Sequence, residues 1–171
     1  MKDKKTMITV ALLCIVLYAL SGWLAIHLFA FSDGTAENGN YVNLCAHIEF
    51  LRPDDWTDIE KSRKNGMTSF FTSDGKGAAV TISLADNVIM SVKDPCDFAH
   101  SAASDIDPAA KEAVYTVLAG EEYSVCYAQK DGTVTAVYVR LIRGKVMIIG
   151  ISAENMIRIR EIAQLFVKRV G

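Results

Sequence analysis

The chain begins with a long apolar segment that contains no charged residue. Residues 7–31 read MITVALLCIVLYALSGWLAIHLFAF, which is 25 residues without Asp, Glu, Lys or Arg. A helix of this length extends roughly 37 Å, and the hydrocarbon core of a bilayer is about 30 Å thick. The segment therefore predicts a single transmembrane helix, and membrane lipid is the first expected partner.

The charges beside this segment predict its orientation in the cell membrane. Residues 1–6 carry three lysines, whereas Asp33 and Glu37 follow the segment. Because Lys and Arg are retained on the cytoplasmic side, we expect a cytoplasmic tail and an extracytoplasmic C-terminal domain. A cleaved secretory signal is the alternative, since residues 19–21 and 30–32 have the small-x-small form of a cleavage site. The uncleaved anchor fits better, because the apolar core of a signal usually has only about 7–15 residues.

The rest of the sequence divides into a linker, residues 32–41, and a domain, residues 42–171. The linker is polar and contains two glycines, and its shortness should keep the domain close to the bilayer. After the apolar segment there are 15 Lys and Arg and 19 Asp and Glu, since the tail holds three lysines and one aspartate of the chain's 18 and 20. This net charge of −4 offers no basic face for phosphate, so no nucleic-acid partner is expected.

The domain carries a succession of strand-like runs separated by glycine turns. Val80, Ile82 and Leu84 alternate with smaller residues, as in a half-buried strand. Asp131-Gly132 and Arg143-Gly144 are turn signals that predict a meander in the C-terminal half. The expected strands are residues 42–51, 67–72, 77–85, 112–118, 122–129, 133–142 and 145–152.

Two helices are expected to pack against this sheet. Asp94 as N-cap and Pro95 as the first helical residue predict a helix over residues 94–105. A second helix is predicted after Ser152, its expected N-cap, and continues to the end of the chain. Its apolar stripe would comprise Ile159, Ile162, Ala163, Phe166 and Val170. The predicted fold class is therefore α+β, an antiparallel sheet sandwiched by helices.

Catalytic motifs are absent from the sequence, which has no G-x-S-x-G, P-loop, H-E-x-x-H or G-x-G-x-x-G. Two Cys–His pairs are weak candidates for a site. Cys45 and His47 would share one face of the first strand with Glu49, which suggests metal ligands. Cys96 and His100 would lie one helical turn apart, as in a metal pair or a thiol activated by an imidazole. Ordinary packing is the favoured interpretation of both pairs, so we expect no catalytic residue, no bound metal and no cofactor.

Three cysteines lie in the domain: Cys45, Cys96 and Cys126. Their spacing fits no zinc motif such as C-x2-C. In an oxidising compartment one disulfide with one remaining thiol is an option, and three buried thiols are the other. The sequence does not select a pair.

Two further features are candidate interface sites. In the stretch HIEFLRPDDW, Pro53 ends a strand and Trp56 follows a turn. We expect this tryptophan to pack over the sheet, with an interface role as the alternative. Arg158 and Arg160 lie on the last predicted helix, where they would face lipid headgroups, an acidic partner or only solvent.

The order of these motifs resembles the PsbP/Mog1 superfamily. The shared features, over residues 43–170, are the P-x-x-W turn, a hairpin reading FFTSDGKGAAVTIS, a G-x-x-Y strand at residues 120–123, a turn with R-G-K and a closing helix reading IRIREIAQLF. Asp55 departs from the glycine that many relatives have before the aromatic residue. The resemblance implies an α-β-α sandwich and a non-enzymatic accessory or assembly subunit, and no metal-site residue of the family can be matched.

Together these observations predict a membrane-anchored binding or assembly subunit, not an enzyme, whose domain docks on a larger membrane-associated complex. One alternative is a small membrane-tethered enzyme or metal-binding protein that uses Cys96 and His100, or Cys45 and His47. The other alternative is a component of an envelope secretion or conjugation machine.

Overall fold

The structure is a computed structural model that describes residues 14–21 and 33–169. The predicted cytoplasmic tail and most of the predicted transmembrane helix lie outside the described residues. Residues 14–21 are helical. Within the described ranges, no helix is both long enough and apolar enough to cross a membrane.

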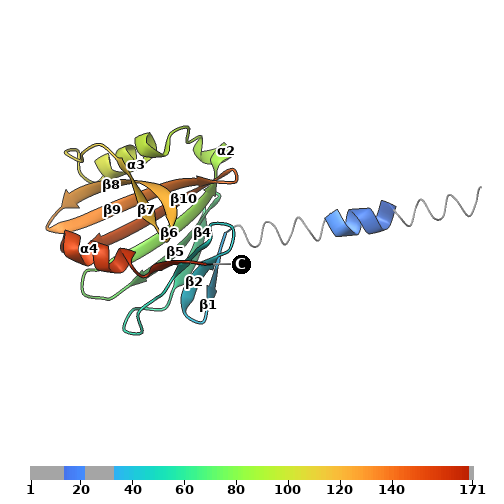
Figure 1. The fold of residues 1–171 in the computed structure, drawn as a ribbon, viewed down its shortest axis with the longest axis horizontal. Helices are drawn as coiled ribbons and strands as arrows, with labels where there is room; N and C mark the ends of the chain where they lie inside the picture. The colour runs from blue at the N-terminus through green and yellow to red at the C-terminus, as the bar shows by residue number, and fades with distance from the viewer. Residues whose placement is uncertain (1–13, 22–32, 170–171) are drawn as a thin grey trace, which may run out of the picture.

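Seven antiparallel strands form the large sheet of the domain (Figure 1). The tight turns at Asp131-Gly132 and Arg143-Gly144 have positive φ at both residues, which matches the right-handed twist of the flanking strands. The predicted meander is thereby confirmed. In spatial order the strands are β4 (Glu60–Lys64), β5 (Met67–Ser73), β6 (Ala79–Asp86), β10 (Lys145–Ala153), β9 (Thr133–Ile142), β8 (Glu121–Lys130) and β7 (Val114–Leu118).

A second, smaller sheet joins the two ends of the domain. Its strands, in spatial order, are β1 (Thr35–Glu37), β2 (Asn40–Asn43), β3 (Ile48–Phe50) and β11 (Phe166–Lys168). Regular pairing therefore begins at Thr35, inside the predicted linker. The predicted strand over residues 42–51 is broken, because Asn43 Oδ1 accepts a hydrogen bond from Ala46 N at 2.9 Å and closes a turn.

Three short helices complete the domain: α2 (Asn87–Met90), α3 (Pro95–Ser104) and α4 (Met156–Ala163). The start of α3 is as predicted, since Asp94 accepts a hydrogen bond from Cys96 N at 2.7 Å. The start of α4 differs from the prediction, because Asn155 caps it by accepting from Arg158 N at 2.9 Å, while Ser152 stays in β10.

The predicted last helix is also too long. After α4 the chain becomes extended, and Phe166 pairs with Phe50 in the small sheet. Leu51 N donates to Leu165 O at 2.9 Å and fixes this change of direction. The predicted apolar stripe thus belongs partly to a helix and partly to a strand, and Val170 lies outside the described residues.

The large sheet is the middle layer of the domain, with a separate core on each face (Figure 1). Val80, Ile82 and Leu84 all face the larger core, as their alternation predicts. This core lies between the large sheet and a layer made of α4 and the small sheet, whereas α3 covers a smaller core on the other face. The α+β class is confirmed, with one correction: a second sheet occupies part of a layer that the sandwich prediction assigned to helices.

Candidate functional site

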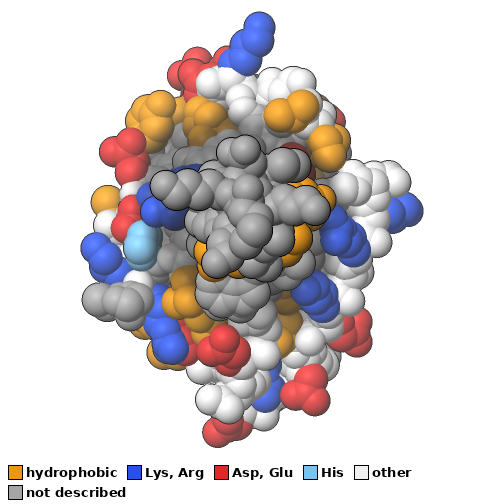
Figure 2. All heavy atoms as spheres, turned by 90° about the vertical axis from the view of Figure 1, so that its right-hand side faces the viewer, with side chains coloured by type: hydrophobic (Ala, Val, Ile, Leu, Met, Phe, Trp, Pro, Cys, Tyr) orange, Lys and Arg blue, Asp and Glu red, His pale blue; other side chains and the backbone are white. Residues whose placement is uncertain are grey.

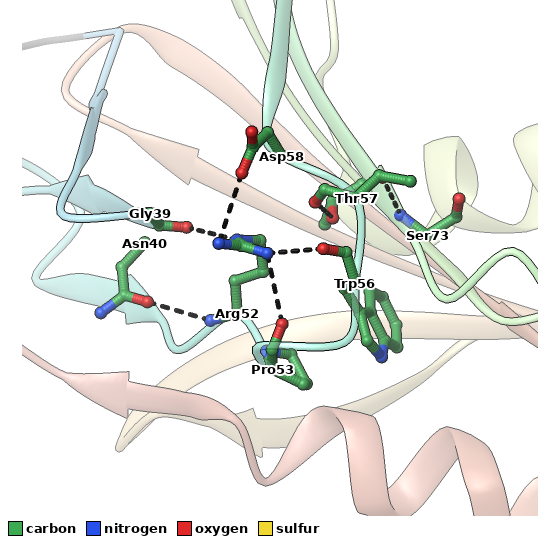
Figure 3. A network of polar contacts seen from close by, with 9 residues as sticks. Gly39, Asn40, Arg52, Pro53, Trp56, Thr57, Asp58 and Ser73 are labelled. Atoms are coloured by element: carbon green, nitrogen blue, oxygen red, sulfur yellow. Dashed lines mark hydrogen bonds and ion pairs between the residues drawn. The ribbon is translucent and has the colours of Figure 1, made fainter.

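The loop after β3, which contains the stretch HIEFLRPDDW, is organised around Arg52 (Figure 3). The Arg52 guanidinium donates from Nε to Gly39 O at 3.0 Å and from Nη1 to Trp56 O at 2.5 Å. Its Nη2 lies 3.4 Å from Asp58 Oδ1. Because a guanidinium can serve several acceptors at once, this one side chain holds the turn against the tip of the β1–β2 hairpin.

Trp56 is part of the core beneath this turn. Its exposed fraction is 4%, and its ring centroid lies 6.2 Å from that of Phe50. Phe166 also packs against Phe50, with ring centroids 4.8 Å apart. The tryptophan therefore joins the first strands of the domain to its last one, and a side chain buried to this degree offers a partner almost no surface.

Cys45 and His47 do not form the shared strand face that the sequence predicts. Both lie in the turn between β2 and β3, and His47 has a left-handed backbone conformation with φ of 55°. Glu49 lies in β3 and accepts a hydrogen bond from Arg169 Nη1 at 2.7 Å. The prediction is wrong because the alternation of side chains is interrupted where the turn begins.

Cys96 and His100 both lie on the side of α3 that faces β8, one helical turn apart as their spacing predicts. Cys96 Sγ donates to Ser124 Oγ at 3.2 Å. His100 Nδ1 lies 3.1 Å from Lys111 O and 4.0 Å from Cys126 Sγ. Cys126, which lies on β8, is therefore a third member of this cluster, and no spacing in the sequence places it beside His100.

The contacts of Cys96, His100 and Cys126 indicate a structural role and not a catalytic one. Cys126 Sγ donates to Lys111 O at 2.9 Å, and burial raises the pKa of this thiol, so the nucleophilic thiolate is disfavoured. His100 Nδ1 is directed at the same carbonyl and is thereby occupied. Nowhere in the described parts of the chain do three His, Cys, Asp or Glu side chains converge on a metal position. The cluster fixes the segment that leads into β7.

Arg158 and Arg160 lie on the surface of α4. Arg158 Nη1 donates to Glu161 Oε2 at 3.0 Å, and its Nη2 lies 4.0 Å from Asp74 Oδ2. The hydrogen bond to Glu161 raises the pKa of Arg158. Arg160 is exposed. The first of these two charges is therefore partly compensated within the domain.

β7 is one edge of the large sheet and exposes large apolar side chains. Among the described strands it pairs only with β8. The exposed fractions of Val114, Tyr115 and Val117 are 55%, 63% and 70%. Because side chains alternate along a strand, Tyr115 and Val117 lie on the α3 side of the sheet and Val114 lies on the other. An apolar edge strand with a row of unpaired backbone groups is a template for a further strand.

A depression of about 310 Å³ lies beside β7 and is lined by Tyr115 and Leu141, among others. Glu121 and Arg140 also line it, and their side chains pair on the opposite face of the sheet, with Arg140 Nη2 2.6 Å from Glu121 Oε2. The Arg140 guanidinium lies 5.6 Å from the ring centroid of Tyr123. Burial raises the pKa of this tyrosine to about 12, although Arg140 acts in the opposite direction. The depression can therefore receive an apolar side chain beside Tyr115.

Sequence reasoning predicts β7 as a strand but misses its role, because a strand becomes an edge only through the pairing of distant segments. One signal was available: Val114 to Leu118 reads VYTVL, without a charge and with apolar residues on both faces. Arg52 was also missed. An arginine whose acceptors are backbone carbonyls leaves no pattern in the sequence.

The sequence matches no described protein family, and no curated protein matches it either. The fold does have solved counterparts. The solution structure of cyanobacterial PsbP (CyanoP) from Synechocystis sp. PCC 6803 superposes with a TM-score of 0.52 and 16% sequence identity, over 79% of this chain and 94% of that one. The domain has a PsbP-like fold. This finding confirms the fold that the sequence resemblance implies.

A second solved structure, from Bacteroides thetaiotaomicron VPI-5482, is more distant from this PsbP-like domain. Its TM-score is 0.43 at 11% identity, over 78% of this chain and 49% of that one. At these identities the comparisons concern the fold alone.

Proposed function

We propose that this protein is a membrane-anchored, non-enzymatic binding or assembly subunit, and that its PsbP-like domain docks on a larger membrane-associated complex through β7. The observation that carries the proposal is the apolar, exposed edge formed by Val114, Tyr115 and Val117. Main-chain hydrogen bonds along such an edge give affinity, and side chains beside it give specificity.

The chemistry of the edge defines the partner. The partner segment that adds to β7 is extended, with apolar residues at alternate positions. Those apolar side chains contact Tyr115 and Val117 on the α3 side of the sheet. On the opposite face of the sheet, where Val114 lies, Arg140 and Glu121 form a partly buried ion pair. A polar side chain that the partner segment places on that face and that reaches Arg140 would fix the register of pairing.

The membrane part of the proposal rests on residues 7–31 and on the helix within them. All eight residues of the helix at 14–21 are exposed, among them Ile15 at 65% and Leu17 at 58%. Apolar side chains that the domain leaves exposed on a helix need lipid or another protein to cover them. We therefore expect the partner complex to lie in or at the same membrane.

Site-specific photo-crosslinking of the full chain in its native membrane tests this function. A photoreactive phenylalanine analogue replaces Val117 on β7 in one variant and Ser62 on β4 in the matched control. The expected result is a discrete adduct from position 117 that disappears when Tyr115→Lys is added, with none from position 62. Equal adducts from both positions, or none from position 117, would remove β7 as the docking edge.

The enzyme alternative is tested in the same membranes. Cys96→Ser and His100→Gln variants remove the thiol and the imidazole but keep a polar group at each position, and they should keep the position-117 adduct. A full chain that purifies alone, carries a stoichiometric metal or reacts unusually fast at a thiol would instead support the alternative at Cys96 and His100.

A further inference from the structure

The end of the domain that holds Asp33 gathers several turns from separate parts of the chain. Asp33 Oδ1 accepts from Lys145 Nζ at 2.6 Å, and its Oδ2 accepts from Thr68 Oγ1 at 3.1 Å. Asn87 N donates to Gly144 O at 2.8 Å. We call this surface the Asp33 end; it comprises Asp33 and residues 44–47, 63–66, 86–93 and 143–145.

Apolar side chains are exposed at the Asp33 end. The exposed fractions of Val88 and Ile89, on α2, are 92% and 59%, and that of Leu44 is 38%. The position of α2 is fixed, because the Asn87 side chain bonds both Val92 N at 2.8 Å and Val92 O at 3.0 Å. These side chains are therefore held on a closed turn that presents them outward.

Basic residues lie around the exposed apolar side chains of the Asp33 end. The Asp33 end contains Arg63, Lys64, Lys93, Arg143 and Lys145 against two acidic residues, Asp33 and Asp86. Figure 2 views the domain from this side and shows Lys, Arg and apolar side chains around the grey residues at the centre, with Asp and Glu among them and at the rim. This excess of positive charge contrasts with the net charge of −4 for the sequence after the apolar segment.

The predicted membrane segment leads directly into this end. Phe31 is two residues before Asp33, a chain length of at most roughly 7 Å. The ion pair with Lys145 holds Asp33 on the sheet. An anchor at residues 7–31 would therefore bring the Asp33 end, and no other face of the domain, to the bilayer surface.

We propose that the Asp33 end binds the surface of an anionic bilayer. Val88 and Ile89 enter the headgroup region, while Lys64, Lys93 and Arg143 contact lipid phosphates. Anionic lipid attracts such basic residues over about a Debye length, and each contributes roughly fivefold to partitioning. The inference rests on the proposed anchor but not on docking through β7. It gives the domain a fixed orientation, with the β7 edge presented beside the membrane.

Hydrogen–deuterium exchange of the full chain in lipid nanodiscs tests the inference. One set of discs contains phosphatidylcholine alone, and the other contains phosphatidylcholine with about one third phosphatidylglycerol. The expected result is roughly tenfold slower exchange over residues 86–93 in the anionic discs, abolished by Lys64→Glu/Lys93→Glu. The matched control is Lys76→Glu/Lys130→Glu, which places the same charges in turns at the opposite end of the sheet and should leave the slowing intact.

The other outcomes separate this inference from the proposed function. Exchange at the same rate in both lipids would overturn lipid recognition, and so would a control variant that abolishes the slowing equally. Neither outcome contradicts the proposed anchor or docking through β7. A chain that alkaline washing strips from the discs overturns the anchor and this inference together. Slower exchange in native membranes but not in anionic discs means that a protein covers the Asp33 end, which also overturns the proposal.

Discussion

The two edges of the large sheet differ in the side chains that they present. β4 reads EKSRK and β7 reads VYTVL, and both are five residues long. Each pairs with one neighbour only among the described strands, so each presents a row of unpaired backbone groups. On β4 every residue is exposed and four of five are charged, whereas the exposed side chains of β7 are mainly apolar.

Charged side chains on an edge strand, lysine above all, discourage pairing with another chain. The contrast therefore indicates that the domain blocks one edge and leaves the other available. The segments that lead into the two strands differ as well. The loop before β4 is fixed by Arg52 and by the bond of Thr72 Oγ1 to Thr57 O at 2.6 Å, and the segment before β7 is tied by His100 and Cys126.

The largest effect is expected on stability, from a substitution beneath the loop that leads into β4. Trp56→Ala should lower the free energy of unfolding by about 3 kcal/mol, because it removes a large buried aromatic side chain. Chemical denaturation of the detergent-solubilised full chain measures this loss, with Trp56→Phe as the milder control. The folded fraction should keep the β7 adduct. A variant that is fully stable but no longer binds its partner would show that Trp56 is an interface residue. The β4 side of the domain would then take part in docking as well as β7.

The next effect concerns binding rather than stability. Val117→Lys should weaken docking by about 2 kcal/mol, roughly 30-fold, because a charge replaces an apolar contact at the edge. Its unfolding free energy should change by less than about 0.5 kcal/mol, as for an exposed substitution. Titration of the purified partner against full chain in nanodiscs measures the affinity. Ser62→Lys on β4 is the control, and an equal loss there would contradict the difference between the edges.

A smaller effect is expected at Asp33, which supports the β4 half of the sheet through Thr68 and Lys145. Burial raises its pKa, but the bonds from Lys145 and Thr68 outweigh burial and hold the pKa below the ordinary 3.8. The carboxylate therefore stabilises the fold above pH 3.8, and this contribution is lost as the pH falls through the lower folded-state pKa.

Asp33→Asn should accordingly cost about 1 kcal/mol at neutral pH and almost nothing near pH 2. Denaturation midpoints across this pH range, compared with Asp97→Asn as an exposed carboxylate control, measure the difference. A cost that does not vary with pH would show that the Asp33 charge is irrelevant to the fold.

The smallest change in stability is expected when the charges of β4 are removed, although this change should cause the chain to self-associate. Lys61→Val/Arg63→Val should alter the unfolding free energy by less than about 0.5 kcal/mol. It should also make β4 a second apolar edge, so that the chain self-associates. Light scattering at increasing concentration in detergent measures this association. Lys61→Glu/Arg63→Glu keeps the edge charged and should stay unassociated; identical behaviour of the two variants would show that charge is not what protects β4.

The elements that the sequence predicts well are those whose apolar alternation is uninterrupted. β6, β9 and β10 each keep one face in the larger core, and their predicted bounds lie close to the observed ones. β4 escapes prediction because its residues are charged and exposed, and it is a strand only through its pairing with β5. The C-terminal helix was predicted too long because pairing with β3 overrides the helical period after Ala163.

The candidate sites follow the same rule. Cys96 and His100 share one side of α3 as predicted, because α3 is a regular helix with a clear start. Cys45 and His47 separate because an asparagine three residues before Ala46 closes a turn that strand periodicity does not reveal. The docking edge at β7 could not be located from sequence, since edge position is a property of the whole sheet.

The pairing of β11 with β3 has a consequence for the order of folding. Phe50 and Phe166 are partners although 116 positions separate them, so the small sheet lacks a strand until residues 166–168 are synthesised. A contact between such distant positions forms only after a large loop closes, which favours late completion of this layer. Until then β3 presents an open side, and a chain that ends before residue 166 would leave the nascent domain exposed to wrong partners at that point.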